Sequence, residues 1–214
     1  CLLGGATYST ADTVRPALQI IKSAHKDRAV SSFLVMVSND KPYVFSDCAI
    51  TINPSAKELA DIALETSLSA EKFGIEPKVA MLSFSTYGSG KGEQVDKVVE
   101  ATKLAKEALQ SDEFKNMKIE LDGELQADAA LDMVVARKKA PASHVAGNAN
   151  VLIFPNLEAG NIGYKLTQRF GHAEAYGPLC QGVSKAVNDL SRGCSSQDIA
   201  GVVAITAVQA QKIN

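Results

Sequence analysis

Short apolar segments alternate along this chain with longer segments in which apolar residues recur at helical spacing. Strands are expected over 32–37, 43–50, 78–84, 117–121 and 150–154, after an opening buried strand that ends near Gly5. Helices are expected over 9–23, 55–73, 93–111, 125–137 and 161–170, with a last helical part that begins at 183–190. This alternation predicts an α/β fold, in which a mostly parallel sheet lies between two helical layers.

Composition excludes several classes of protein. With 214 residues, 46% of them hydrophobic, the chain can bury a full core in one or two domains. A net charge of −2 gives no basic surface for nucleic acid or anionic membrane, and no apolar run reaches the ~18 to 20 residues of a membrane helix. We therefore expect a soluble, cytoplasmic protein without nucleic-acid or membrane partners.

The four cysteines, Cys1, Cys48, Cys180 and Cys194, form no CxxC pair and lack metal-ligand spacing. The loop after Gly5 is a strand-to-helix junction rich in hydroxyl residues, but it lacks the GxGxxG pattern of dinucleotide sites. We expect no metal and no tightly bound cofactor.

A turn followed by a helix is predicted near the end of the chain. Gly193 permits a sharp turn, Ser195 has the character of an N-cap, and Asp198 stands three positions later as the acidic half of a capping box. The beginning of a helix favours anions through its free amides and its dipole. From spacing alone, Asp198 is either a capping carboxylate or a catalytic base.

Four sequence blocks, in order over nearly the whole chain, resemble the phosphate acetyltransferase family. They are GATYSTADTVRPALQ at 5–19, DGELQ at 122–126, PNLEAGNIGYK at 155–165 and SRGCSSQDI at 191–199, which continues as VAITAVQAQ. The resemblance implies two subdomains with an active cleft between them, as in isocitrate and isopropylmalate dehydrogenases. Residues 29–180 would form the second domain, and 1–28 with 181–214 would be the remnant of a discontinuous first domain. Roughly the first third of the family's enzyme has no counterpart here, so we expect a fragment.

The resemblance also implies a reaction, the reversible transfer of acetyl between acetyl phosphate and coenzyme A in a ternary complex. Asp198 would take the proton from the coenzyme A thiol, while Ser191 and Arg192 would hold acetyl phosphate and polarise its carbonyl. A thiol with a pKa near 8.5 costs only about 2 kcal/mol to ionise at pH 7, at ~1.36 kcal/mol per pKa unit, so positioning must contribute more than the base.

Further residues are assigned to substrate binding by the same resemblance. The phosphate end would be held by Ser9, Thr10 and Arg15, with Cys48 beside the cleft and Tyr164 and Lys165 facing it from the second domain. Each has a plainer interpretation. The arginines could be surface charges, Cys48 a small buried apolar residue, and Tyr164 and Lys165 part of a solvated helix face.

Two alternative functions stay open. One is a longer acyl preference, as in phosphate butyryltransferases, since one methylene changes binding by only about 1 to 3 kcal/mol. The other is a non-catalytic acyl-CoA-binding domain, similar to the regulatory C-terminal half of some malic enzymes. For the leading function, the resemblance also implies a homodimer.

Overall fold

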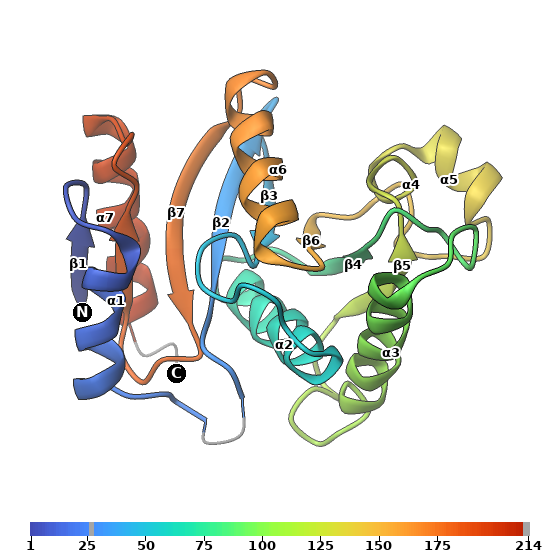
Figure 1. Cartoon of the computed structure of the whole chain (residues 1–214), viewed down its shortest axis with the longest axis horizontal. Helices are drawn as coiled ribbons and strands as arrows, with labels where there is room; N and C mark the ends of the chain where they lie inside the picture. Colours follow the sequence, from blue (N-terminus) through green and yellow to red (C-terminus); the bar gives the residue numbers. More distant parts are fainter. Residues whose placement is uncertain (26–27, 212–214) are drawn as a thin grey trace.

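The computed structural model describes residues 1–25 and 28–211, which form eight strands and seven helices (Figure 1). The strands are β1 (Leu2–Gly5), β2 (Ser31–Ser38), β3 (Lys41–Ser46), β4 (Lys78–Leu82), β5 (Glu120–Leu125), β6 (Val151–Ile153), β7 (Glu174–Gln181) and β8 (Val187–Leu190). The helices are α1 (Thr10–Ile20), α2 (Ala56–Lys72), α3 (Glu93–Ala108), α4 (Ala127–Leu131), α5 (Met133–Lys139), α6 (Leu157–Arg169) and α7 (Ser196–Ala210).

The strands form one mixed sheet in the order β1-β8-β7-β2-β3-β6-β4-β5. The pairs β1–β8, β3–β6, β6–β4 and β4–β5 are parallel, whereas β8–β7, β7–β2 and β2–β3 are antiparallel. Asn39 and Asp40, both at positive φ, connect β2 to β3 as a two-residue hairpin turn. The predicted α/β class is confirmed. The sheet is continuous through both predicted domains, and the division into domains stays a prediction.

Two core clusters on opposite faces of the sheet show the three layers directly. Along β4, Val79 and Met81 belong to the cluster that includes α2, α3 and α7 residues, and Ala80 and Leu82 to the cluster that includes α4, α5 and α6 residues. The alternation follows from the period of two along a strand, and burial on both faces explains why β4 and β6 are almost wholly apolar. Within the described residues, no helix is long and apolar enough to cross a membrane.

The structure corrects four predicted elements. The opening strand β1 is an edge strand, with Leu2 41% exposed, and it is not buried. The strand expected over 117–121 is β5, which extends to Leu125. The single helix expected over 125–137 is two short helices, because Asp132 leaves helical geometry and its carboxylate caps α5. Residues 187–190 form β8 in place of a helix, next to β7, which was not predicted.

The β7–β8 ladder is limited to a single register pair, Leu179 with Asn188. Pro178 precedes Leu179 and has no N–H to donate, so the ladder does not extend through it. Beyond this pair Gly177 and Leu190 line the same groove without pairing. The sheet therefore opens between β7 and β8.

Arg28 connects the segment after α1 to α2 and to the turn that precedes β5. Its guanidinium contacts Glu65 at 2.9 Å, forms a two-oxygen ion pair with Glu113, and lies 5.4 Å from the centre of the Phe114 ring. The hydrogen bond from Arg28 lowers the pKa of Glu113, more than partial burial raises it.

This pairing predicts a pH-dependent stability. Because the folded pKa of Glu113 is depressed, its contribution is complete above the unfolded value of about 4.3 and is lost as the pH falls through the folded value. Glu113→Gln should lower the melting temperature at pH 7, and the difference from wild type should shrink at low pH. The control is Glu100→Gln, because Glu100 is exposed and has no ion pair among the described residues. A constant difference at all pH values would contradict the prediction.

Close packing of α6 on the loop after β3 predicts a second effect. A Cβ on Gly160 would lie 2.2 Å from the Asp47 carbonyl oxygen, which is backbone, whereas one on Gly163 would lie 2.9 Å from the Phe154 ring, which is a side chain. Gly160→Ala should cost about 1–3 kcal/mol in urea unfolding in spite of its gain in helix propensity. Gly163→Ala, the matched control in the same helix, should cost less, and the reverse order would be evidence against the contact.

Candidate active site

A groove of about 290 Å³ lies between α6 and the turn that leads from β8 into α7. Figure 1 shows these two helices on either side of β7, where the sheet opens. The polar wall on α6 consists of Tyr164, Lys165, Gln168 and Arg169. The opposite wall and the floor consist of Ser191, Gly193, Cys194 and Asp198 with Leu34, Ala175, Gly177, Leu190 and Val202.

Hydrogen bonds within the turn hold Ser191 at the groove. The Cys194 N–H donates to the Ser191 carbonyl at 3.1 Å, and the Gly193 N–H donates to Ser191 Oγ at 3.3 Å. The half-buried Cys194 packs against the core. The turn that carries Ser191 is therefore held by its own hydrogen bonds and by the packing of Cys194.

The predicted capping box is present at the start of α7. Ser195 Oγ accepts from the Asp198 N–H at 3.1 Å, and Asp198 Oδ2 accepts from the Ser195 N–H at 2.7 Å. Asp198 also lines the groove, half-buried, in the same wall as Ser191. The carboxylate thus caps the helix through one oxygen and lies at the groove, so the structure allows both interpretations of this residue.

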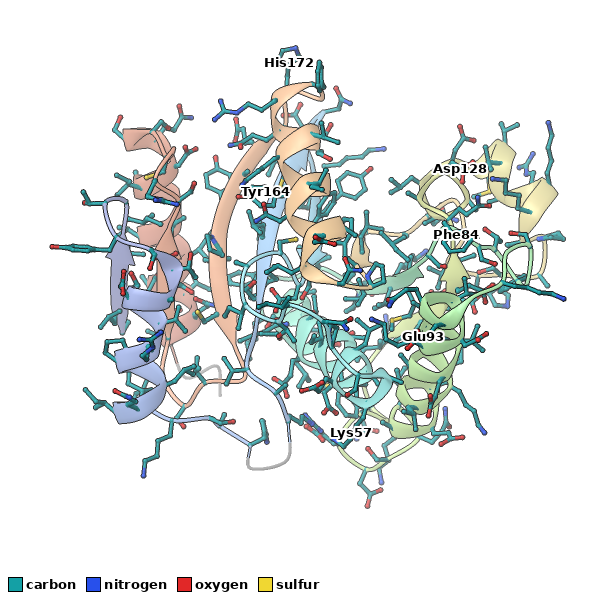
Figure 2. All side chains as sticks on the ribbon, viewed as in Figure 1. Lys57, Phe84, Glu93, Asp128, Tyr164 and His172 are labelled. Carbon is teal, nitrogen blue, oxygen red and sulfur yellow. The ribbon has the colours of Figure 1, made fainter. Side chains whose placement is uncertain are left out.

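Tyr164 and Lys165 reach the groove from α6. The N-cap of this helix is Asn156, whose side chain accepts from the Ala159 N–H. Figure 2 shows Tyr164 between α6 and β7. Burial raises the pKa of Tyr164, and the negative charge that Cys48 can carry raises it further, whereas Arg169 lowers it. The Lys165 ammonium lies 5.7 Å from the centre of the Tyr164 ring.

A second cavity, of about 420 Å³, is lined by Thr10 and Arg15 of α1 and, from another segment, by Ala49 and Ile50. Thr10 Oγ1 donates to Asp189 Oδ2 at 2.6 Å, and Asp189 lies in β8 two residues before Ser191. Its other oxygen, Oδ1, is buried and has no hydrogen-bond partner among the described residues. One strand thus supports both cavities.

Three of the predicted residues line neither cavity. Ser9 is the N-cap of α1, where its hydroxyl accepts from the Asp12 N–H and donates to the Asp12 carboxylate. Arg192 is exposed in the turn. Cys48 is 0% exposed and lies beneath α6, where Asn161 donates to its carbonyl at 3.0 Å.

The environment of Cys48 does not favour a thiolate. Burial raises the pKa of its thiol well above the usual value, and the charge of Asp47 raises it further. The Asp47 carboxylate accepts from three consecutive loop amides, those of residues 49 to 51, and fixes the loop on which Cys48 stands. The thiol is therefore a packed apolar group, as the plainer interpretation held.

The structure thus brings Ser191, Asp198, Tyr164 and Lys165 into one groove, with Thr10 and Arg15 in the neighbouring cavity. Sequence reasoning missed Gln168 and Arg169, although both follow Tyr164 and Lys165 by four positions and so share their face of the helix. Among the residues that the structure describes, no group of three or more His, Cys, Asp or Glu could hold a metal ion.

Comparison with known proteins gives the same family as the four sequence blocks at 5–19, 122–126, 155–165 and 191–199. The family model described as phosphate acetyl/butaryl transferase matches residues 1–207. The phosphate acetyltransferases of Clostridium acetobutylicum and Bacillus subtilis are 56% and 53% identical and match 99% and 98% of this chain. The chain spans only 63% and 62% of their lengths.

Solved structures agree with this. The EutD phosphotransacetylase from Staphylococcus aureus is similar with a TM-score of 0.89 at 51% identity, over 98% of this chain and 63% of that one. A branched-chain phosphotransacylase from Enterococcus faecalis has a TM-score of 0.78 at 26% identity, over 98% of this chain and 73% of that one. The chain belongs to the phosphate acetyl/butaryl transferase family.

Proposed function

We propose that the protein that carries this chain transfers acetyl reversibly between acetyl phosphate and coenzyme A. The observation that supports this most directly is that Ser191 and Asp198 stand together in one groove opposite a polar wall of α6. Relatives that are more than half identical to this chain are phosphate acetyltransferases, which favours acetyl over longer acyl groups.

The proposed step is direct attack within a ternary complex. The coenzyme A sulfur forms a bond to the carbonyl carbon of acetyl phosphate as Asp198 takes the thiol proton. The carbon–oxygen bond to phosphate then breaks, acetyl-CoA forms, and the proton leaves with phosphate. Coenzyme A is a co-substrate, and neither a metal nor a tightly bound cofactor is required by this route.

Other residues would position the two substrates. Ser191 donates a hydrogen bond toward acetyl phosphate from the fixed turn, and Arg192 polarises the carbonyl after its exposed side chain rotates inward. Thr10 and Arg15 bind a phosphate group in the neighbouring cavity, a cation and a hydroxyl being the groups that suit phosphate oxygens. Ser9 holds the start of α1 beside them. We expect the active form to be a homodimer in the cytoplasm.

Asp198→Asn in the complete protein tests the base. It should lower kcat by about 100- to 10,000-fold, the usual range for a general base. Because it also disturbs the capping box, Ser195→Ala is the matched control, since it breaks the same cap at a cost of about 1 kcal/mol but keeps the carboxylate. A thiol-release assay gives both rates. Equal losses for the two variants would assign Asp198 to capping alone.

Direct transfer also predicts that no acetyl group accumulates on Cys48. The thiol is buried and its pKa is raised, so acetyl phosphate alone should leave Cys48 unmodified in intact-protein and peptide mass spectrometry. Iodoacetamide should alkylate Cys48 only after denaturation. An acetylated Cys48 peptide that disappears when coenzyme A is added would replace this mechanism with a covalent one.

A further inference from the structure

The wall of the groove on α6 carries two cations on one face of the helix. Lys165 and Arg169 are four positions apart and both line the groove. Like charges at this spacing slightly destabilise a helix when nothing lies between them. Among the described residues, neither side chain forms a salt bridge, although other lysines and an arginine of the chain do.

Acidic side chains in the groove do not balance this pair. Asp198 is the one carboxylate among the residues that line it, and its Oδ2 is already engaged by the Ser195 N–H. Glu174, at the start of β7, accepts from the Tyr176 hydroxyl at 2.5 Å and is not part of the lining. The groove therefore holds two cations and one carboxylate, an excess of positive charge that suits an anion.

The guanidinium of Arg169 also lies close to the turn that carries Ser191. A Cβ on Gly193 would stand 3.8 Å from Arg169 Nη2 and 3.9 Å from Ser191 Oγ. Because Gly193 has no side chain, the space between these two hydrogen-bonding groups is open. An anion placed there could accept from the hydroxyl on one side and from the guanidinium fork on the other.

From these observations we propose that Arg169, supported by Lys165, binds the phosphoryl group of acetyl phosphate opposite Ser191. This deepens the proposed function and rests on it, and it differs from it in one point: the phosphoryl group lies in the groove and not in the cavity of Thr10 and Arg15. Coenzyme A also carries phosphates, but a long pantetheine arm separates them from the thiol. A phosphoryl group in the same small groove as the base Asp198 therefore belongs to the acyl phosphate, or to the inorganic phosphate that replaces it.

The test measures phosphate binding and kinetics on the complete protein. Arg169→Gln should weaken the binding of inorganic phosphate, measured by calorimetry without coenzyme A, by about 10- to 100-fold, the loss expected for a charge-assisted contact. The KM for acetyl phosphate should rise by a similar factor, and the KM for coenzyme A should change by less than about twofold. Arg169→Lys, which keeps the charge but loses the fork, should be intermediate.

Arg137→Gln is the matched control, because Arg137 also lies in the last turn of a helix, α5, away from the groove. It reproduces the loss of a cation at a helix end without touching phosphate. If Arg169→Gln and Arg137→Gln lower the melting temperature alike and leave phosphate affinity and KM unchanged, Arg169 is only a helix-terminal cation. A rise in the coenzyme A KM alone would give the site to coenzyme A and also overturn the proposal.

These outcomes are separate from failure of the proposed function. If the wild-type protein transfers no acetyl group, the function is wrong, and the calorimetric comparison with phosphate still decides whether Arg169 binds a phosphoryl group.

Discussion

The candidate active site depends on the point where β7 and β8 stop pairing. Only Leu179 and Asn188 form a register pair, because Pro178 cannot supply the next amide. A continuous ladder would have brought Gly177 against Leu190 and closed the groove that both residues line. The opening is stabilised by buried polar contacts, since Asn188 accepts from the Cys180 N–H and donates to Thr206 and Gln209 of α7. A missing hydrogen bond in the sheet thus leaves space for the groove.

The second important feature is the way in which β8 holds two loops at once. Its Asp189 carboxylate accepts from Thr10 at the start of α1, and its end continues into the turn that carries Ser191. The two cavities are therefore positioned by a single short strand. The buried Asp189 Oδ1, which has no partner in the part of the chain that the structure describes, lies where a Cβ on Gly5 would be only 2.3 Å away, so glycine is needed at that position.

Local sequence patterns predicted the features that depend on local chemistry. The α/β class followed from alternating periods, and the Ser195–Asp198 capping box followed from spacing. Elements whose identity depends on distant partners were missed. β7 contains Gly177 and Pro178, which suggest a turn, and β8 contains Asn188 and Asp189, whose burial is tolerable only because of partners elsewhere in the chain. Arg169 was missed because a helix face cannot be assigned to a groove before the opposite wall is known.

The position of β1 limits how this sheet can grow. Within residues 1–25 and 28–211, β1 bonds to β8 on one side only, and at the other end of the order β5 bonds only to β4. Six strands between them have both neighbours, so a ninth strand, whether from the same polypeptide or from another, can join only alongside Leu2–Gly5 or alongside Glu120–Leu125. Of these two places, the first is next to β8, so a strand added there would be separated by β1 alone from the strand that leads into the turn with Ser191.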